Sequence, residues 1–150
     1  MLDIESLGLL GVFIAGAIPW MEAIAVVPGG IVVGLDPVAT VIAASLGNAI
    51  TIFVFAYFAS NIRARLINRR VRKGKSAQLP KLEKALKAFD KYGVYGLAAL
   101  GPILIGTQFA AAAAVSAGVK PLRSSILITV SMFLWAIVIA VAVVALDIKI

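Results

Sequence analysis

Glu22 is the only ionisable residue in the long apolar stretch between Ser6 and Gly34. Burying a carboxylate in hydrocarbon is costly, so an acidic residue in such a stretch usually faces a cavity or binds a proton or a cation. Burial without a cationic partner also favours the protonated form. We therefore expect Glu22 to bind protons or substrate. The alternative is a carboxylate that caps a helix at the water interface and takes no part in transport.

A four-residue phrase occurs twice along the chain, first as Gly34-Leu35-Asp36-Pro37 and then, 84 residues later, as Gly118-Val119-Lys120-Pro121. Each copy follows a long apolar stretch broken by proline and glycine. Each is followed by a charge-free run of 23 residues, Val38–Ser60 and Ser124–Leu146. Paired, interrupted hydrophobic segments in the two halves of a chain are typical of transporters built from repeats, and the interruptions indicate the binding site.

The offset between the two phrases predicts which polar residues accompany Glu22. It places Gly106 opposite Glu22, so Thr107 and Gln108 are the expected polar neighbours in a substrate- or proton-binding site. Thr107 could instead satisfy a carbonyl freed at a helix break. Asn48 is expected at a related depth, either as a ligand contact or as a polar contact between helices.

We expect the apolar stretches to be interrupted at the residues that favour helix breaks. These expected hairpin breaks are Pro19, Pro28, Gly29, Gly30, Pro102 and Gly106.

The composition indicates an all-α integral membrane protein. Hydrophobic residues make up 62% of the chain and charged residues 14%, and the mean hydropathy is +1.06. A soluble domain could not bury so much apolar surface. The chain has no cysteine and no histidine, and it shows no glycine-rich phosphate loop and no Ser/His/Asp set. We therefore expect no enzyme activity, no catalytic residue, no metal site and no cofactor.

The elements that must position these residues can be arranged in two ways. The runs 38–60 and 124–146 are long enough to cross a bilayer as helices. The interrupted stretches 6–34 and 92–119 are either kinked spans, which gives four crossings, or re-entrant hairpins that enter and leave on the same face. Non-helical backbone at membrane depth is tolerated only where protein or a cavity surrounds it.

The segment 61–91 carries eleven of the fourteen Lys and Arg residues. Beside a membrane span, such a segment is more typical of a cytoplasmic loop than of a nucleic-acid site, so we expect lipid and no nucleic acid as its partner. Residues 79–91 predict a basic amphipathic helix in the membrane interface. Binding of a protein partner is the alternative for that helix.

The charge distribution favours the hairpin topology. With 61–91 inside, hairpins leave the acidic Asp36 outside and place Lys120 and Arg123 inside, as the positive-inside rule requires. Four crossings would put both cations outside. The expected fold is therefore an inverted repeat of a re-entrant hairpin plus a transmembrane helix, with repeats 1–60 and 92–150. Lys120 and Arg123 could bind an anion or a lipid headgroup at the cytoplasmic rim.

The chain resembles a known family in segments from both halves. In the first half these are Pro19-Trp20-Met21-Glu22, Pro28-Gly29-Gly30, Gly34-Leu35-Asp36-Pro37 and Ala44-Ser45-Leu46-Gly47-Asn48. In the second half they are Lys91-Tyr92-Gly93-Val94-Tyr95-Gly96-Leu97, Gly101-Pro102 and Ile105-Gly106-Thr107. These segments are similar to the small multidrug export family, which itself resembles the DedA (SNARE-associated, VTT-domain) membrane proteins.

The resemblance implies inverted repeats of a hairpin and a transmembrane helix, with Glu22 in the place of the DedA acidic residue. Some DedA proteins are proposed to be proton-dependent flippases for polyprenyl phosphate. DedA proteins carry arginines at the second hairpin, where this chain has Gly106, Thr107 and Gln108, and Arg123 is the only arginine nearby. The chain departs from the DedA pattern at the positions that would bind phosphate.

We therefore expect a proton-coupled secondary transporter in the cytoplasmic membrane of a prokaryote. It would export small amphipathic or cationic compounds, with Glu22 as the coupling carboxylate. Two spans and two hairpins form a small body, so a homodimer is expected. The alternatives are a flippase for polyprenyl phosphate or another lipid, and a membrane scaffold or lipid-organising protein that transports nothing.

Overall fold

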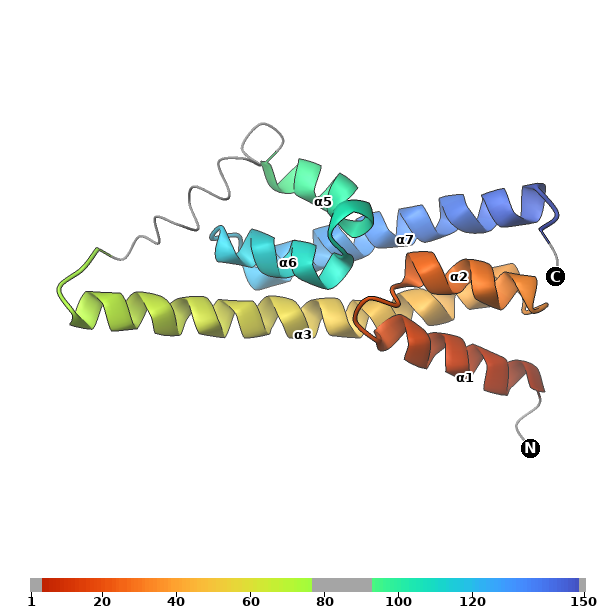
Figure 1. Cartoon of the computed structure of the whole chain (residues 1–150), viewed down its shortest axis with the longest axis horizontal. Helices are drawn as coiled ribbons and strands as arrows, with labels where there is room; N and C mark the ends of the chain where they lie inside the picture. Colours follow the sequence, from red (N-terminus) through yellow and green to blue (C-terminus); the bar gives the residue numbers. More distant parts are fainter. Residues whose placement is uncertain (1–3, 77–92, 149–150) are drawn as a thin grey trace. The chain divides into compact units, whose positions relative to one another are not determined.

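The computed structural model describes residues 4–76 and 93–148, and the elements in these ranges are all helices (Figure 1). In chain order they are α1 (Ile4–Ala17), α2 (Ala23–Val32), α3 (Pro37–Arg72), α5 (Gly93–Leu104), α6 (Thr107–Ser116) and α7 (Pro121–Ala145). The all-helical expectation is confirmed for these ranges. The amphipathic helix expected at 79–91 lies outside the described residues.

Two of these helices, α3 and α7, are long and apolar enough to cross a membrane. At about 1.5 Å per residue, α7 is roughly 38 Å long and α3 roughly 54 Å, against a hydrocarbon core of about 30 Å. Helix α3 continues to Arg72, whereas the sequence predicted its end at Ser60. The basic segment contains good helix formers and no glycine or proline before Gly74. Gly74 has φ of 69°, and the amide of Lys75 donates back to the carbonyl of Arg70 at 3.0 Å, which ends the helix.

The repeated four-residue phrase forms the same helix-ending turn in both halves. Gly34 and Gly118 have φ of 93° and 101° just after α2 and α6. The amide that follows each glycine donates back to the helix, Leu35 N to Gly30 O at 3.1 Å and Val119 N to Ala114 O at 3.0 Å. This is a Schellman motif, which glycine forms without steric cost. The proline that ends each phrase then starts the next helix, where its missing N–H costs nothing.

The helices follow the same order in the two halves of the chain. Helices α2 and α6 each have ten residues and are 84 residues apart, and α3 and α7 begin at the same separation. Each ten-residue helix is preceded by another short apolar helix, α1 or α5.

The interruptions lie at only some of the expected residues. The chain leaves helical structure at residues 18–22, which include Pro19, and again at residues 105–106, which include Gly106. Pro28, with Gly29 and Gly30, lies inside α2, and Pro102 lies inside α5, so the prediction that these four residues break the hairpins was wrong. An internal proline removes one intrahelical hydrogen bond, which membrane helices tolerate.

The chain divides into two compact units, a first unit of Met1–Ile52 with Thr129–Ile150 and a second unit of Phe53–Ile128. In the first unit, α1 packs against α3 with almost no intervening side chains. A Cβ added to Gly16 would overlap the carbonyl oxygen of Ala44, and one added to Gly47 would overlap that of Phe13. Small residues at helix contacts are typical of membrane helices, whose backbones can then approach closely.

Helix α2 returns along α1, so the chain leaves this helix pair near its entry point. At one end, a Cβ added to Gly8 in α1 would lie 2.8 Å from Leu35 Cδ2, just after α2. Further along, a Cβ on Gly30 would lie 2.6 Å from Thr40 Cγ2 and 3.2 Å from Val12 Cγ2. Residues from α1, α2 and the start of α3 therefore share one core.

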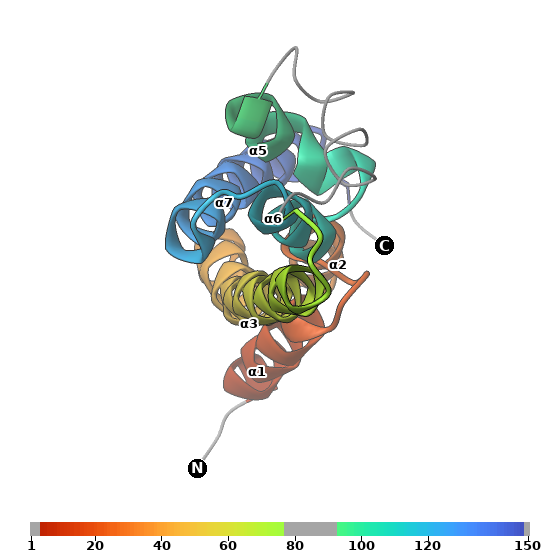
Figure 2. The ribbon, with the colours of Figure 1, turned by 90° about the vertical axis from the view of Figure 1, so that its left-hand side faces the viewer.

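In the second unit, α5 and α6 form a similar pair, and α6 also lies beside α3 and α7 (Figures 1 and 2). A Cβ on Gly101 would lie 2.7 Å from Ala110 Cβ. The Phe55 and Phe109 rings meet edge to face at 6.1 Å. Ser124 Oγ donates to the carbonyl of Ala111 at 3.0 Å, which joins α7 to α6.

The second helix pair also returns to the end where it began. Tyr95 lies in the first turn of α5 and Arg123 in the first turn of α7, and Arg123 Nη2 donates to Tyr95 Oη at 2.9 Å. The entry into α5 and the exit from α6 are therefore neighbours within this unit.

Candidate functional site

Glu22 is the N-cap residue of α2, and the residue is only 8% exposed. Its carbonyl oxygen accepts from the amides of Ala25 and Val26, each at 3.0 Å, while its side chain makes no capping hydrogen bond. Glu22 is thus a buried carboxylate whose side chain does not cap its own helix.

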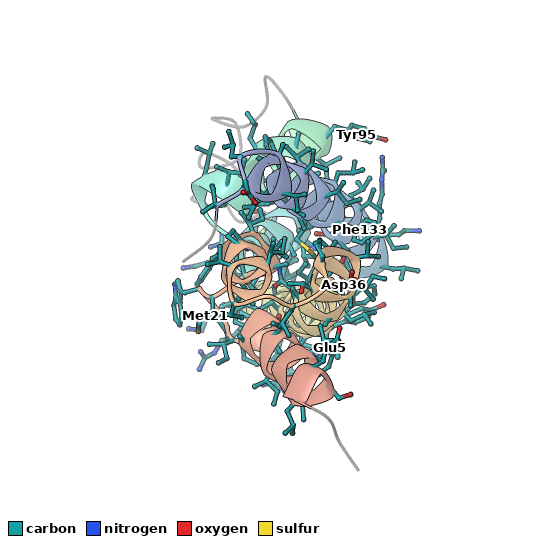
Figure 3. The ribbon with its side chains drawn as sticks, turned by 90° about the vertical axis from the view of Figure 1, so that its right-hand side faces the viewer. Glu5, Met21, Asp36, Tyr95 and Phe133 are labelled. Atoms are coloured by element: carbon teal, nitrogen blue, oxygen red, sulfur yellow. The ribbon has the colours of Figure 1, made fainter. Side chains whose placement is uncertain are left out.

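The turn before Glu22 has an unusual backbone. Trp20 has φ of 73°, a left-handed conformation that is rare for a bulky residue, and Met21 N donates to Ile18 O at 3.1 Å. Trp20 and Met21 are both exposed, and Figure 3 shows Met21 at this turn. The turn therefore presents two large apolar side chains outward and buries the carboxylate that follows them.

An apolar groove runs between α1 and α2 within the first unit. Its volume is about 720 Å³, and glycines and small or apolar side chains line it. Trp20 and Met21 form part of the wall, directly before Glu22 in the chain. Ligand sites of small molecules have volumes of about 300–1,000 Å³. The groove is therefore large enough for the apolar body of a small compound.

Asn48 is fully buried in α3, in the same unit as Glu22. It follows Gly47, whose close contact with Phe13 holds this turn of α3 against the end of α1. Ser45, one helical turn earlier, is also buried, and its Oγ has no hydrogen-bond partner among the described residues. Sequence reasoning did not select Ser45. Its spacing of three from Asn48 places both on one side of α3.

Thr107 and Gln108 are fully buried in the second unit, in the first turn of α6. Thr107 Oγ1 donates to Gln108 Oε1 at 3.1 Å. Gly106 is the N-cap residue with φ of 92°, so a glycine occupies in the second repeat the place that Glu22 occupies in the first. The equivalence predicted from the 84-residue offset therefore applies to the helix boundaries.

The structure groups these residues by unit. Glu22 and Asn48 belong to the first unit, and Thr107 and Gln108 belong to the second. The expected approach of Thr107 and Gln108 to Glu22 stays a prediction.

The cations Lys120 and Arg123 are exposed at the start of α7, as a headgroup site requires. Two residues that sequence reasoning did not select accompany them. Tyr95 accepts the hydrogen bond from Arg123, and the Arg123 Cζ lies 5.7 Å from the Tyr95 ring centre. Arg63 of α3 packs against the turn before α7, with Nη2 3.5 Å from the position of a Cβ on Gly118. Arg63 is the first charge after the run 38–60, which is the signal that could have found it.

Within residues 4–76 and 93–148, no three carboxylate side chains gather in a way that could hold a metal ion.

Comparisons with known proteins give one family. No curated protein and no solved structure matches the chain. A family model described as "Putative small multi-drug export protein" matches residues 22–138, which begin at Glu22 and reach into α7. Together with the two helices long and apolar enough to span a bilayer, this match indicates a membrane protein. The chain belongs to this family of small multi-drug export proteins.

Proposed function

We propose that the protein is a proton-coupled secondary transporter that exports small amphipathic or cationic compounds. The observation that carries this proposal is Glu22, a buried carboxylate in the break between two short apolar helices. Intramembrane acids are costly and are generally kept for binding protons, ions or substrates. The family description, small multi-drug export, supports the direction and the substrate class.

The proposed mechanism is competition for one carboxylate. When ionised, Glu22 attracts a lipophilic cation, whose apolar body would occupy the groove between α1 and α2. A proton that arrives from the other side of the membrane neutralises Glu22 and removes this attraction. Fixed charges act most strongly where water is scarce, so a single carboxylate is enough to couple the two ligands.

We propose that both helix pairs are re-entrant hairpins. At about 1.5 Å per residue, α1 is roughly 21 Å long, α5 roughly 18 Å, and α2 and α6 roughly 15 Å each. None of these lengths reaches the roughly 30 Å that a span requires. The contact of Gly8 with Leu35 and that of Tyr95 with Arg123 support a return of each pair to its starting face.

We also propose how the chain is oriented in the membrane and which membrane holds it. The two repeats would run in opposite directions across the cytoplasmic membrane of a prokaryote, with the basic segment 61–91 inside. A homodimer would complete the pathway. Most of the surface of the apolar spans in α3 and α7 is not buried within the chain, which leaves room for such a contact.

A second candidate is transport of a lipid phosphate across the membrane. The exposed cations Lys120 and Arg123 at the start of α7 favour it, because they could bind a headgroup phosphate. Glu22, in contrast, repels an anion when it is ionised. The apolar groove and the absence of arginine in the first turn of α6 favour the cationic substrate.

Proteoliposomes under an imposed pH gradient distinguish these candidates. Lipophilic-cation flux and polyprenyl-phosphate flip are measured in parallel on the same preparation, with empty liposomes as the control. We expect gradient-driven cation flux and no flip. Flip without cation flux, lost in Arg123→Ala and retained in Arg123→Lys, would establish the second candidate instead. Neither activity in a folded, correctly reconstituted protein would indicate a scaffold or lipid-organising role.

A further inference from the structure

Three cations from two segments of the chain lie at or beside the turn between α6 and α7, within the second unit. Arg63 of α3 packs against Gly118, Lys120 follows two residues later, and Arg123 lies in the first turn of α7. We call these three residues the headgroup cluster. Its described surroundings contain no counter-charge, because residues 53–76 and 93–128 include no Asp or Glu.

Arg63 of α3 is partly buried against this turn. Its Nε is buried and has no hydrogen-bond partner among the described residues. The guanidinium lies beside backbone, with Cζ 4.0 Å from a Cβ position on Gly118. A buried donor that is left unpaired is unfavourable, whereas a phosphate oxygen would satisfy it with a charge-assisted hydrogen bond.

The start of α7 differs from its equivalent in the first repeat in a way that also favours an anion. At the start of α3, Asp36 Oδ1 accepts from Ala39 N at 2.8 Å (Asp36 is labelled in Figure 3). The equivalent residues before and in α7 are Lys120 and Arg123. Among the described residues, no side-chain oxygen caps this helix. The repeat therefore replaces an internal carboxylate by a cation, and an external anion can take the place of that carboxylate.

Tyr95 orients one member of the cluster. Its hydroxyl accepts from Arg123 at 2.9 Å, and Figure 3 shows the side chain extending outward from α5. A tyrosine at this position is typical of the membrane–water interface. Arg63 follows the charge-free run 38–60 and Arg123 precedes the run 124–146, so both arginines lie where the apolar segments end. Phospholipid phosphates lie at this level of a bilayer.

We propose that the headgroup cluster binds the phosphate of an anionic phospholipid, which stays in place and stabilises the turn between α6 and α7. The lipid supplies a capping anion for α7 and an acceptor for the Nε of Arg63, neither of which the described residues provide. Its acyl chains lie along the apolar surface of α7. The headgroup cluster belongs to the second unit, whereas Glu22 belongs to the first.

The test uses the purified full-length protein in a neutral detergent. Phosphatidylglycerol is the probe, and phosphatidylcholine and inorganic phosphate are the comparison ligands. Native mass spectrometry gives the affinity of bound lipid, and heating followed by size-exclusion chromatography gives the apparent melting temperature. We expect phosphatidylglycerol to bind and to raise the melting temperature. Phosphatidylcholine, whose ammonium offsets its phosphate, and inorganic phosphate should do so far less.

Three variants test whether phosphatidylglycerol binds at the headgroup cluster. Arg63→Gln should weaken phosphatidylglycerol roughly tenfold, since it removes a charge-assisted contact. Arg65→Gln removes the same charge two residues away on α3 and should leave the affinity within about twofold. Lys120→Asp recreates the cap of the first repeat. It should raise the melting temperature without lipid and abolish the further rise that lipid produces, which keeps the test decisive if Arg63→Gln is unstable.

Two results would overturn the proposal. Equal weakening by Arg63→Gln and Arg65→Gln would show general attraction to the basic segment rather than a site. An equal stabilisation by inorganic phosphate would show that the ligand is a free anion and not a lipid.

Discussion

Replacing Gly47 by alanine should separate α1 from α3 and destabilise the first unit. The added methyl group would overlap the Phe13 carbonyl oxygen and would lie 3.0 Å from Phe13 C and 3.1 Å from Ala17 N. All three are backbone atoms, so no side-chain rotamer can relieve the overlap. The helix α1 itself must shift.

The expected magnitude follows from two opposing terms. Overpacking costs about 1–3 kcal/mol, and a clash with backbone belongs at the upper end. Alanine is favoured over glycine inside a helix by about 1 kcal/mol. The net loss is about 2 kcal/mol of unfolding free energy. For a chain of 150 residues this corresponds to a melting temperature lower by roughly 4–8 °C.

The assay is the apparent melting temperature of the detergent-solubilised protein, from the fraction that stays monodisperse after heating. Gly29→Ala is the matched control, because a Cβ on Gly29 has nothing within 4 Å and the residue also lies in a helix. The control should melt at or above the wild-type temperature. If Gly47→Ala melts as high as Gly29→Ala, then α1 does not pack on α3 as described.

Two further predictions concern the helix starts and the topology. Asp36→Ala removes the 2.8 Å cap of α3 and should lower stability by about 1 kcal/mol. Asp36→Asn, which can still accept this hydrogen bond, should retain most of the wild-type melting temperature, and equal melting of the two variants would refute the capping role. For the topology, single cysteines are introduced as Asp36→Cys, Lys75→Cys and Lys120→Cys and treated with an impermeant thiol reagent in intact cells. We expect labelling at position 36 only. Labelling at position 120 from outside would exclude the hairpin topology.

The sequence was most informative where local chemistry alone decides the structure. Gly34 and Gly118 need left-handed backbone to end a helix, and Pro37 and Pro121 suit the first position of the next one. These requirements are confined to a few neighbouring residues. The order of the elements and the 84-residue repeat could therefore be predicted from the sequence.

The positions of the breaks were harder to predict because proline does not always end a membrane helix. Pro28 and Pro102 each cost one hydrogen bond and stay within α2 and α5. The residues with left-handed backbone next to the breaks are Trp20 and Gly106. A glycine with positive φ can be anticipated, but a tryptophan in this conformation cannot, since the surrounding structure must impose it.

The site was predictable only in part. Glu22 is conspicuous as a lone charge in an apolar stretch, and its burial follows from that setting. Ser45 and Arg63 were not selected, because their importance depends on tertiary packing. Ser45 is notable for a buried hydroxyl without a partner among the described residues, and Arg63 for its contact with Gly118, far away in the chain.

The most direct test of the proposed function is proton-driven flux through Glu22→Gln in proteoliposomes. Glutamine keeps the size and polarity of Glu22 but can neither bind a proton nor attract a cation as a carboxylate does. We predict that cation flux driven by a pH gradient is lost, while expression and melting temperature stay close to wild type and Glu22→Asp retains measurable flux. Full gradient-driven flux by Glu22→Gln across the physiological pH range would contradict the account. Poor folding with normal flux in the surviving protein would contradict it equally, because that result would make Glu22 a structural residue.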